Sequence, residues 1–129
     1  MIVVDTSAVV DALTLVAGTE SLRGRLASED LHAPHLIDYE VVAAVRGLAH
    51  GGRLSEPRAV DVLTDFGDLR IARWPAAGAL LHRAFQLRHN LSAYDAAYVA
   101  LAEALQCPLI TRDARLAKVT PPTVQIELR

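Results

Sequence analysis

The sequence predicts an α/β protein in which a parallel sheet is covered by helices on both faces. Short apolar runs alternate with longer helical stretches along the chain, which is the pattern of parallel-sheet proteins. Hydrophobic residues make up 52% of the 129 residues and aromatic residues only 5%, so the core must consist mainly of Ala, Val and Leu. This length suits one domain spanning residues 1–129. No apolar run approaches the roughly 18 residues of a membrane span, so no contact with a membrane is expected.

Five short strands are expected, because five apolar runs are bounded by residues that interrupt extended structure. The first run ends at Asp5, the second is stopped by Pro34, and the third is stopped by Pro75. The predicted strands are Ile2–Val4, Leu31–Ala33, Leu69–Trp74, Cys107–Thr111 and Val124–Leu128.

Seven helical stretches are expected between these strands, with residues that start and end helices at their boundaries. Asp5 and the two residues after it are good N-cap residues and precede the first helix. Gly18 ends that helix, and Gly51 with Gly52 closes the strongly apolar third one. The predicted helices are 8–16, 21–27, 36–48, 55–66, 77–88 and 94–105, followed by a single helical turn over 113–116.

The charge of the chain neither indicates nor excludes nucleic-acid binding. The formal net charge is −2, without the surplus of Lys and Arg that is common in nucleic-acid-binding domains. Lys118 is the only lysine, so arginine supplies almost all of the positive charge, and the arginine fork suits phosphate groups. Clustered carboxylates also lower the formal charge, and a bound divalent metal ion would restore it.

The single cysteine and the scattered histidines argue against several kinds of site. Cys107 alone can form neither an internal disulfide nor a cysteine-based zinc cluster. The five histidines include no pair spaced at i and i+4, so a histidine zinc site has little support. The segment 1–5 lacks the basic region and the long apolar stretch of a signal peptide, so the cytoplasm is the expected location.

Four carboxylates carry the functional prediction. Asp5 ends the first strand and Asp113 follows the strand that ends at Thr111, so both belong at the edge of the sheet where parallel-sheet proteins bind ligands. Asp95 stands at the start of a helix. Glu40 lies within an apolar helix, on or beside the face that packs inward, where a carboxylate without a partner is costly.

Each of these acids also has a purely structural interpretation. Asp5 and Asp113 are good N-cap residues for the helical segments that follow them. The stretch from Ser92 to Asp95 fits a capping box, which is a common pattern. Asp38 competes with Glu40 for the functional role, although an acid near a helix start is easily accommodated.

The set of acids is more informative than any single member. At least two of them belong at the same sheet edge, and no lysine lies near them in the sequence to neutralise them. Clustered carboxylates raise each other's pKa, and a divalent cation resolves that repulsion. Oxygen ligands without supporting cysteines favour a hard ion such as Mg²⁺ or Mn²⁺.

Four segments of the chain resemble the motifs of the PIN-domain nucleases, and specifically of VapC-type toxins. The segment 2–8, Ile-Val-Val-Asp-Thr-Ser-Ala, is similar to the N-terminal strand and first acidic motif of that family. Glu40 with the two valines after it resembles the second motif. The segment 91–96 resembles the third motif, where an Asp opens a helix, and 109–113 resembles the fourth, a strand that ends in Thr-x-Asp. The four motifs occur in order over nearly the whole chain.

The resemblance implies a PIN-like, Rossmann-like three-layer α/β/α fold with a central parallel sheet of four or five strands. It also implies an acidic pocket that holds one or two Mg²⁺ or Mn²⁺ ions. Asp5 and Asp95 would be direct metal ligands, and Glu40 and Asp113 would complete the pocket directly or through water. The hydroxyl groups expected to hydrogen-bond these carboxylates, or a metal-bound water, are those of Thr6, Ser7 and Thr111.

The implied activity is metal-dependent hydrolysis of phosphodiester bonds in RNA, which needs no nucleophilic side chain. Arg112 and Arg115 flank Asp113 and are candidates to contact the RNA backbone. The family further implies a cognate antitoxin that blocks the pocket, and a homodimer. The alternative is a catalytically silent PIN-like domain used for binding or assembly, which would predict that one or more of the four acids is missing.

Overall fold

The computed structural model describes all 129 residues and arranges five short strands in one sheet with the order β3-β2-β1-β4-β5. Every neighbouring pair of strands is parallel. The strands are β1 (Ile2–Val4), β2 (Leu31–Pro34), β3 (Ile71–Trp74), β4 (Leu109–Thr111) and β5 (Ile126–Leu128). The helices are α1 (Thr6–Leu13), α2 (Glu20–Ala27), α3 (Ile37–His50), α4 (Glu56–Asp68), α5 (Ala79–Gln86), α6 (Ala93–Leu105) and α7 (Ala114–Val119).

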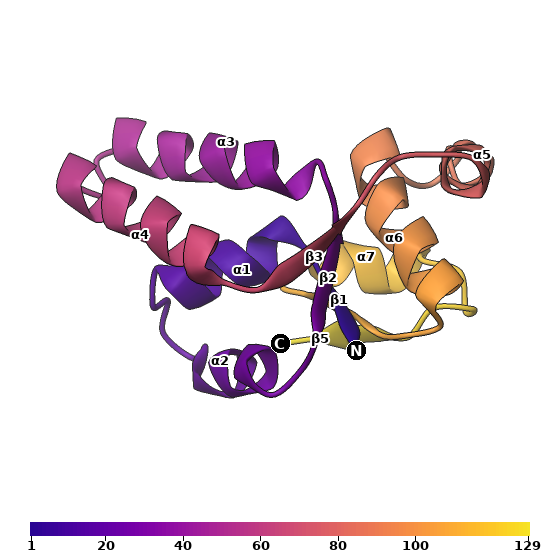
Figure 1. Ribbon diagram of the computed structural model, residues 1–129, viewed down its shortest axis with the longest axis horizontal. Helices are drawn as coiled ribbons and strands as arrows, with labels where there is room; N and C mark the ends of the chain where they lie inside the picture. The colour runs from indigo at the N-terminus through magenta and orange to yellow at the C-terminus, as the bar shows by residue number, and fades with distance from the viewer.

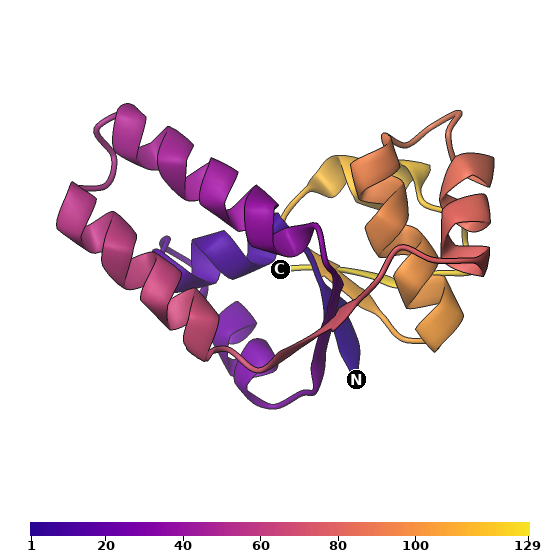
Figure 2. The same ribbon diagram turned by 45° about the horizontal axis from the view of Figure 1, so that its top comes forward.

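Helices cover both faces of the sheet (Figures 1 and 2), which confirms the predicted three-layer α/β/α class. Helices α1 to α4 connect β1, β2 and β3 and lie on one face, whereas α5 and α6 connect β3 to β4 and lie on the other. Right-handed crossovers explain this division, because the connections to β2 and β3 run one way from β1 and the connection to β4 runs the other way. The order in which strands are added to the sheet therefore reverses between β1 and β4, and parallel sheets bind ligands at such a point.

The core consists mainly of small and branched aliphatic side chains, as the composition predicts. All residues of β1 and β4 are buried, and 28 buried side chains form one cluster. Ile37 and Val41 of α3 pack into this core from one face, and Val99 and Leu101 of α6 pack into it from the other. None of the helices combines the length and the apolar character that crossing a membrane requires. The two central strands thus hold their carboxyl ends in fixed positions.

Helices α1, α5 and α7 differ most from the sequence-based prediction, and α5 is two residues shorter than predicted at each end. Helix α1 begins at Thr6 rather than Ala8, because Asp5 alone provides the cap, and it ends at Leu13, shortly before Leu15 adopts a left-handed φ of 56°. Helix α7 spans Ala114–Val119, so the prediction of a single turn there was wrong.

Three strands begin later than predicted, because the residues before them still bond elsewhere. The Leu69 N–H bonds to the Asp65 and Phe66 carbonyl oxygens at the end of α4, so β3 begins only at Ile71. The Cys107 N–H bonds back to the Ala102 carbonyl oxygen of α6, so β4 begins only at Leu109. The Val124 N–H is used in a turn, so β5 begins only at Ile126. The carboxyl ends of all five strands agree with the prediction to within one residue.

Candidate active site at the edge of strands β1 and β4

Asp5 lies buried directly after the carboxyl end of β1, at the point where the strand order reverses. Its N–H bonds to the Ile110 carbonyl oxygen (3.2 Å), which fixes the backbone against β4. Its Oδ1 atom accepts hydrogen bonds from the Ser7 hydroxyl (2.7 Å) and the Ala8 N–H (2.9 Å). Its Oδ2 atom accepts a hydrogen bond from the Thr111 hydroxyl. Asp5 therefore caps α1, as the structural interpretation predicts, and hydroxyl groups hold both of its oxygens.

Burial raises the pKa of Asp5, because only 7% of the residue is exposed and the charged carboxylate loses its hydration. The hydrogen bonds to its oxygens lower the pKa in part, and the negative charge of Asp113 raises it. No basic side chain forms an ion pair with Asp5 in the protein. A nearby cation would therefore stabilise its charged form.

Thr111 joins Asp5 to Asp113. Its hydroxyl donates to Asp5 and accepts the backbone N–H of Asp113 (3.0 Å). The Ser7 hydroxyl lies 3.4 Å from that of Thr111 and accepts the backbone N–H of Arg112 (3.1 Å). These bonds tie the end of β4 to the start of α1 and fix the first and fourth acids relative to each other.

Glu40 is half-buried on α3 and is held by two hydroxyl groups. Its Oε1 atom accepts hydrogen bonds from Tyr98 (2.6 Å) and Thr6 (3.0 Å). Tyr98 is buried, and burial followed by its hydrogen bond to Glu40 raises the pKa of the phenol, so the hydroxyl remains protonated and able to donate. The Glu40 Oε2 atom accepts no hydrogen bond from the protein, which leaves it available to a metal ion or to water.

Tyr98 is the site residue that sequence analysis missed. It lies three residues after Asp95 on a strongly apolar helix, where a tyrosine is usually part of the core. The signal in the sequence was weak: a buried tyrosine hydroxyl needs a partner, and position 98 is about one helical turn from an acid of the site.

Asp38, the competing acid of α3, is engaged elsewhere. Its two carboxylate oxygens accept hydrogen bonds from Nε and Nη2 of Arg73 at 2.8–3.0 Å, in a forked arrangement. Glu40 is therefore the acid that α3 contributes to the site.

Asp95 and Asp113 stand at the starts of α6 and α7 and share one arginine. The Nη2 atom of Arg115 lies 2.7 Å from Oδ2 of Asp95 and 3.1 Å from Oδ2 of Asp113. The Asp113 Oδ1 atom accepts the Arg115 N–H (2.9 Å) and caps α7, whereas the Ser92 hydroxyl caps α6. The hydrogen bond to Asp95, followed by the charges of both acids, raises the pKa of Arg115.

Arg112, the other arginine predicted to contact RNA, is directed away from the acids. Its Nε atom donates to Asp11 (2.8 Å), and its Nη1 atom donates to the backbone carbonyl oxygen of Arg129 (2.8 Å). Of the two arginines, Arg115 alone has its guanidinium group at the acidic site.

The four acids thus form one site with two unlike halves. The hydroxyl-held half consists of Asp5, Glu40, Thr6, Ser7, Tyr98 and Thr111, and the arginine-held half consists of Asp95, Asp113 and Arg115. No three of the carboxylates converge closely enough in this arrangement to hold a metal ion. The donor set nevertheless fits Mg²⁺ or Mn²⁺, because every candidate ligand is an oxygen and the Arg115 guanidinium already contacts two carboxylates as a single cation.

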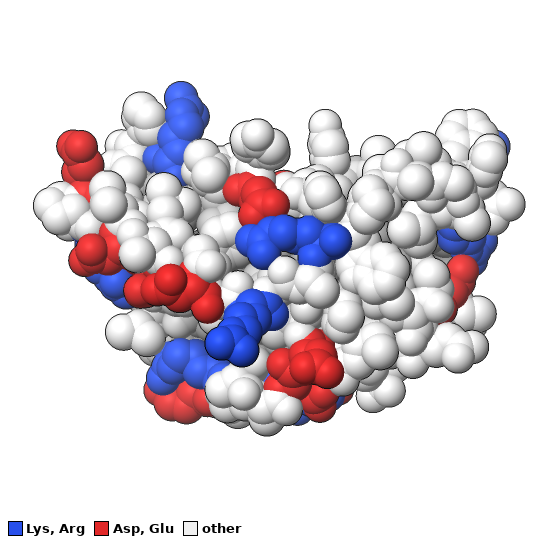
Figure 3. Space-filling view, viewed as in Figure 1, with Lys and Arg blue, Asp and Glu red and all other residues white.

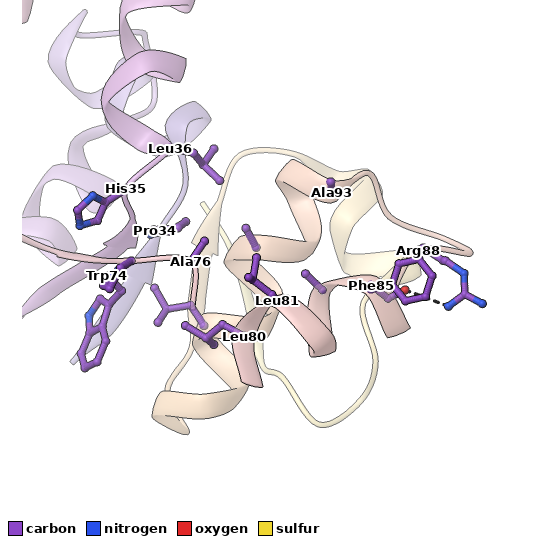
Figure 4. A pocket seen from close by; sticks show the side chains of 14 residues that line it. Pro34, His35, Leu36, Trp74, Ala76, Leu80, Leu81, Phe85, Arg88 and Ala93 are labelled. Carbon is purple, nitrogen blue, oxygen red and sulfur yellow. Dashed lines mark hydrogen bonds between the residues drawn. The ribbon is translucent and has the colours of Figure 1, made fainter. Parts of the chain in front are cut away.

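A separate apolar pocket of about 380 Å³ lies between the ends of β2 and β3 and helices α5 and α6 (Figure 4). Trp74, Leu81 and Phe85 contribute to its walls, and none of the four acids does. Figure 3 shows few charged side chains over α5 and α6, whereas acidic and basic groups are interspersed elsewhere on that face. The pocket lining is mostly apolar, with His35 and Arg88 as its ionisable residues and no carboxylate, so the acids form the candidate active site.

Comparison with known proteins identifies the family and the fold of the chain. The family model described as PIN domain matches residues 2–120. The chain is 45% identical over 117 residues to ribonuclease VapC9 of Mycobacterium tuberculosis, an alignment that covers 91% of this chain and 89% of that protein. It is 43% identical over 127 residues to ribonuclease VapC1 of the same organism, covering 98% and 96%. VapBC2 from Rickettsia felis, solved with a DNA fragment from its promoter, has the same fold, with a TM-score of 0.72 at 15% identity and coverage of 100% and 99%.

Proposed function

Because this chain belongs to the PIN-domain family and, within it, to the VapC ribonucleases, we propose that it is an endoribonuclease that hydrolyses phosphodiester bonds in RNA. In this proposal residues 1–129 form one domain that acts as the toxin of a VapBC-type toxin–antitoxin pair. The observation that carries the proposal is the buried Asp5 at the β1–β4 edge, linked through Thr111 to Asp113. A catalytically silent domain would have no need to keep this costly buried carboxylate together with three further acids.

The cofactor that we propose is one or two ions of Mg²⁺ or Mn²⁺, because PIN-domain ribonucleases are generally metal-dependent. Asp5 and Asp95 would bind the metal directly, and Glu40 and Asp113 would do so directly or through water. When bound, the metal supplies activation of water and neutralisation of charge on the leaving oxygen.

The remaining side chains of the site orient these ligands. Ser7 and Thr111 fix both oxygens of Asp5, and Thr6 fixes one oxygen of Glu40. Tyr98 is a positioning residue, because it holds the same Glu40 oxygen while the other oxygen stays open. Such outer contacts set the direction and the basicity of metal ligands.

The proposed partners are an RNA substrate and a cognate antitoxin. The Rickettsia felis structure contains a VapBC pair, and an acidic pocket attracts a basic segment of a protein inhibitor. Arg115 is the candidate contact for the RNA backbone, because its guanidinium group is exposed beside the acids. We also propose a homodimer and a cytoplasmic location; light scattering on the purified protein tests the former.

The first test is cleavage of a pool of structured cellular RNAs by the purified protein in Mg²⁺ or Mn²⁺. We expect discrete cuts with 5′ phosphates that disappear in excess EDTA. Asp5→Asn should lower the rate by more than roughly a hundredfold, since losing only an outer contact of a metal site costs 10- to 100-fold. Asp38→Asn is the matched control, because Asp38 pairs with Arg73 outside the site, and it should cleave like the wild type.

Two results would contradict the proposal. Cleavage that persists in EDTA, or equally in Asp5→Asn, would point to a contaminating nuclease. Absence of cleavage under all conditions, with a folded protein, would favour the binding module.

A further inference from the structure

Arg115 is the only basic side chain that forms an ion pair with any of the four acids. Its Nη2 atom lies between Asp95 (2.7 Å) and Asp113 (3.1 Å), and these two acids come from the first turns of different helices. One guanidinium group therefore offsets part of the charge of two carboxylates that would otherwise repel each other.

The Arg115 contact differs from the forked arginine–carboxylate pairs of the protein. Arg73 on Asp38 and Arg83 on Glu103 each use both Nε and Nη2, as a forked pair. Arg115 uses Nη2 alone, and its Nε and Nη1 atoms donate to no protein group. Its side chain is also 55% exposed. Single-nitrogen pairs exposed to water are weak, so this contact is easily broken.

We propose that Arg115 is an exchangeable counter-ion of the metal site: it offsets part of the charge of Asp95 and Asp113 in the metal-free protein and gives way when a divalent cation binds them. This inference rests on the proposed function, because it concerns the same acids. The exchange replaces a singly charged cation by a doubly charged one at the two oxygens that Nη2 contacts. Arg115 therefore lowers the affinity of the site for metal and sets the metal concentration at which the site fills.

The location of Arg115 makes such an exchange feasible without moving the fold. Its backbone N–H bonds to Oδ1 of Asp113, so the start of α7 stays capped whether or not the guanidinium group leaves. The guanidinium group contacts only Asp95 and Asp113, so its release into solvent breaks no other protein contact. The hydroxyl-held half has no basic side chain that could be exchanged in the same way.

The test is the dissociation constant for Mn²⁺, measured by calorimetry on the purified wild type, Arg115→Gln and Arg112→Gln. Arg115→Gln should bind Mn²⁺ about three- to tenfold more tightly than the wild type, which corresponds to the strength of one or two exposed ion pairs. Arg112→Gln removes the same charge three residues away, but its partners are Asp11 and the Arg129 carbonyl oxygen. It should bind Mn²⁺ with nearly wild-type affinity.

Thermal unfolding of the same variants gives a second measurement that does not depend on activity. In EDTA, Arg115→Gln should unfold at a lower temperature than the wild type, and saturating Mn²⁺ should remove the difference. Equal or weaker Mn²⁺ affinity in Arg115→Gln, while the wild type binds Mn²⁺, would overturn the exchange but leave the proposed function standing. If no variant binds Mn²⁺, including the wild type, the metal dependence itself is wrong and the exchange falls with it.

Discussion

The two halves of the site handle negative charge in opposite ways. In the hydroxyl-held half, Asp5 and Glu40 accept hydrogen bonds from neutral groups and contact no basic side chain. In the arginine-held half, Asp95 and Asp113 share the Arg115 guanidinium and stand at exposed helix starts. Neutral donors fix where a carboxylate points but leave most of its charge in place, whereas the shared arginine offsets part of the charge of both acids.

The difference follows from where each acid lies in the fold. Asp5 follows a strand that is buried on both faces, so long basic side chains cannot reach it with their charged ends in water. Asp95 and Asp113 lie at helix starts near the surface, where Arg115, two residues after Asp113 and twenty after Asp95, reaches both. The buried half is therefore preorganised and the exposed half is adjustable, and the variants below test this division.

Asp5→Asn should lower cleavage more than any other substitution. It should nevertheless raise stability relative to the metal-free wild type as the pH rises, because the buried Asp5 carboxylate is destabilising. Burial raises the pKa of Asp5 in the folded protein above the value of 3.8 that is ordinary for the unfolded chain. At pH values between the unfolded-state pKa and the higher folded-state pKa, Asp5 holds a proton in the folded protein that it has lost in the unfolded chain. The stability of the metal-free wild type should therefore fall as the pH rises through this window, and Asp5→Asn should lack that contribution.

The measurement is urea unfolding of both proteins in EDTA at several pH values between about 4 and 8. We expect Asp5→Asn to gain stability relative to the wild type as the pH rises, and to match or exceed it at neutral pH. A constant difference across the range would mean that the Asp5 carboxylate is not destabilised by burial.

Thr111→Val should have the next largest effect, because one hydroxyl serves two acids. The substitution keeps the shape of the buried side chain but removes the donor to Asp5 and the acceptor of the Asp113 N–H. Leaving buried polar groups without partners costs about 1 to 3 kcal/mol each. Cleavage should fall by up to about a hundredfold through the loss of ligand orientation.

Thr111→Ser is the control, since it restores the hydroxyl while removing a methyl group. It should recover most of the activity even if it lowers stability. If Thr111→Ser and Thr111→Val are equally slow, packing rather than the hydroxyl explains the loss.

Tyr98→Phe should lower cleavage by about tenfold, at the lower end of the range for outer contacts of a metal site. Glu40 then keeps one donor, Thr6, instead of two. The loss should appear in kcat and in Mn²⁺ affinity, while the melting temperature changes little. Tyr94→Phe is the matched control, because Tyr94 is exposed on the same helix and makes no side-chain hydrogen bond. Equal rates for the two variants would remove Tyr98 from the site.

Much of the fold could be predicted from the sequence, because its local signals agree with one another. The apolar runs mark all five strands, and the acids that end β1 and follow β4 meet because parallel strands share their carboxyl edge. The capping roles of Asp5 and Asp113 were also predicted from the sequence. Both residues cap a helix and at the same time belong to the candidate site.

Contacts between distant segments could not be predicted. The Tyr98 hydroxyl finds Glu40 across 58 residues, and a tyrosine within an apolar helix gives little sign of such a partner. Arg112 and Arg115 are alike in sequence, yet the position of the chain end directs one toward Arg129 and leaves the other for Asp95. Which carboxylate receives a long side chain is decided by packing geometry rather than by spacing.

The smallest expected effect is a difference between the two halves in how salt changes the Mn²⁺ affinity of their variants. The Arg115 ion pairs are exposed, so raising the KCl concentration from about 0.1 M to about 1 M, where the screening length falls from about 10 Å to about 3 Å, should weaken them. The ratio of Mn²⁺ affinities between Arg115→Gln and the wild type should then shrink to less than about twofold. The corresponding ratio for Tyr98→Phe should stay constant, because it arises from the hydrogen bond of a neutral, buried phenol rather than from an exposed ion pair. If both ratios change in parallel with salt, the two halves do not differ in the way that their partners imply.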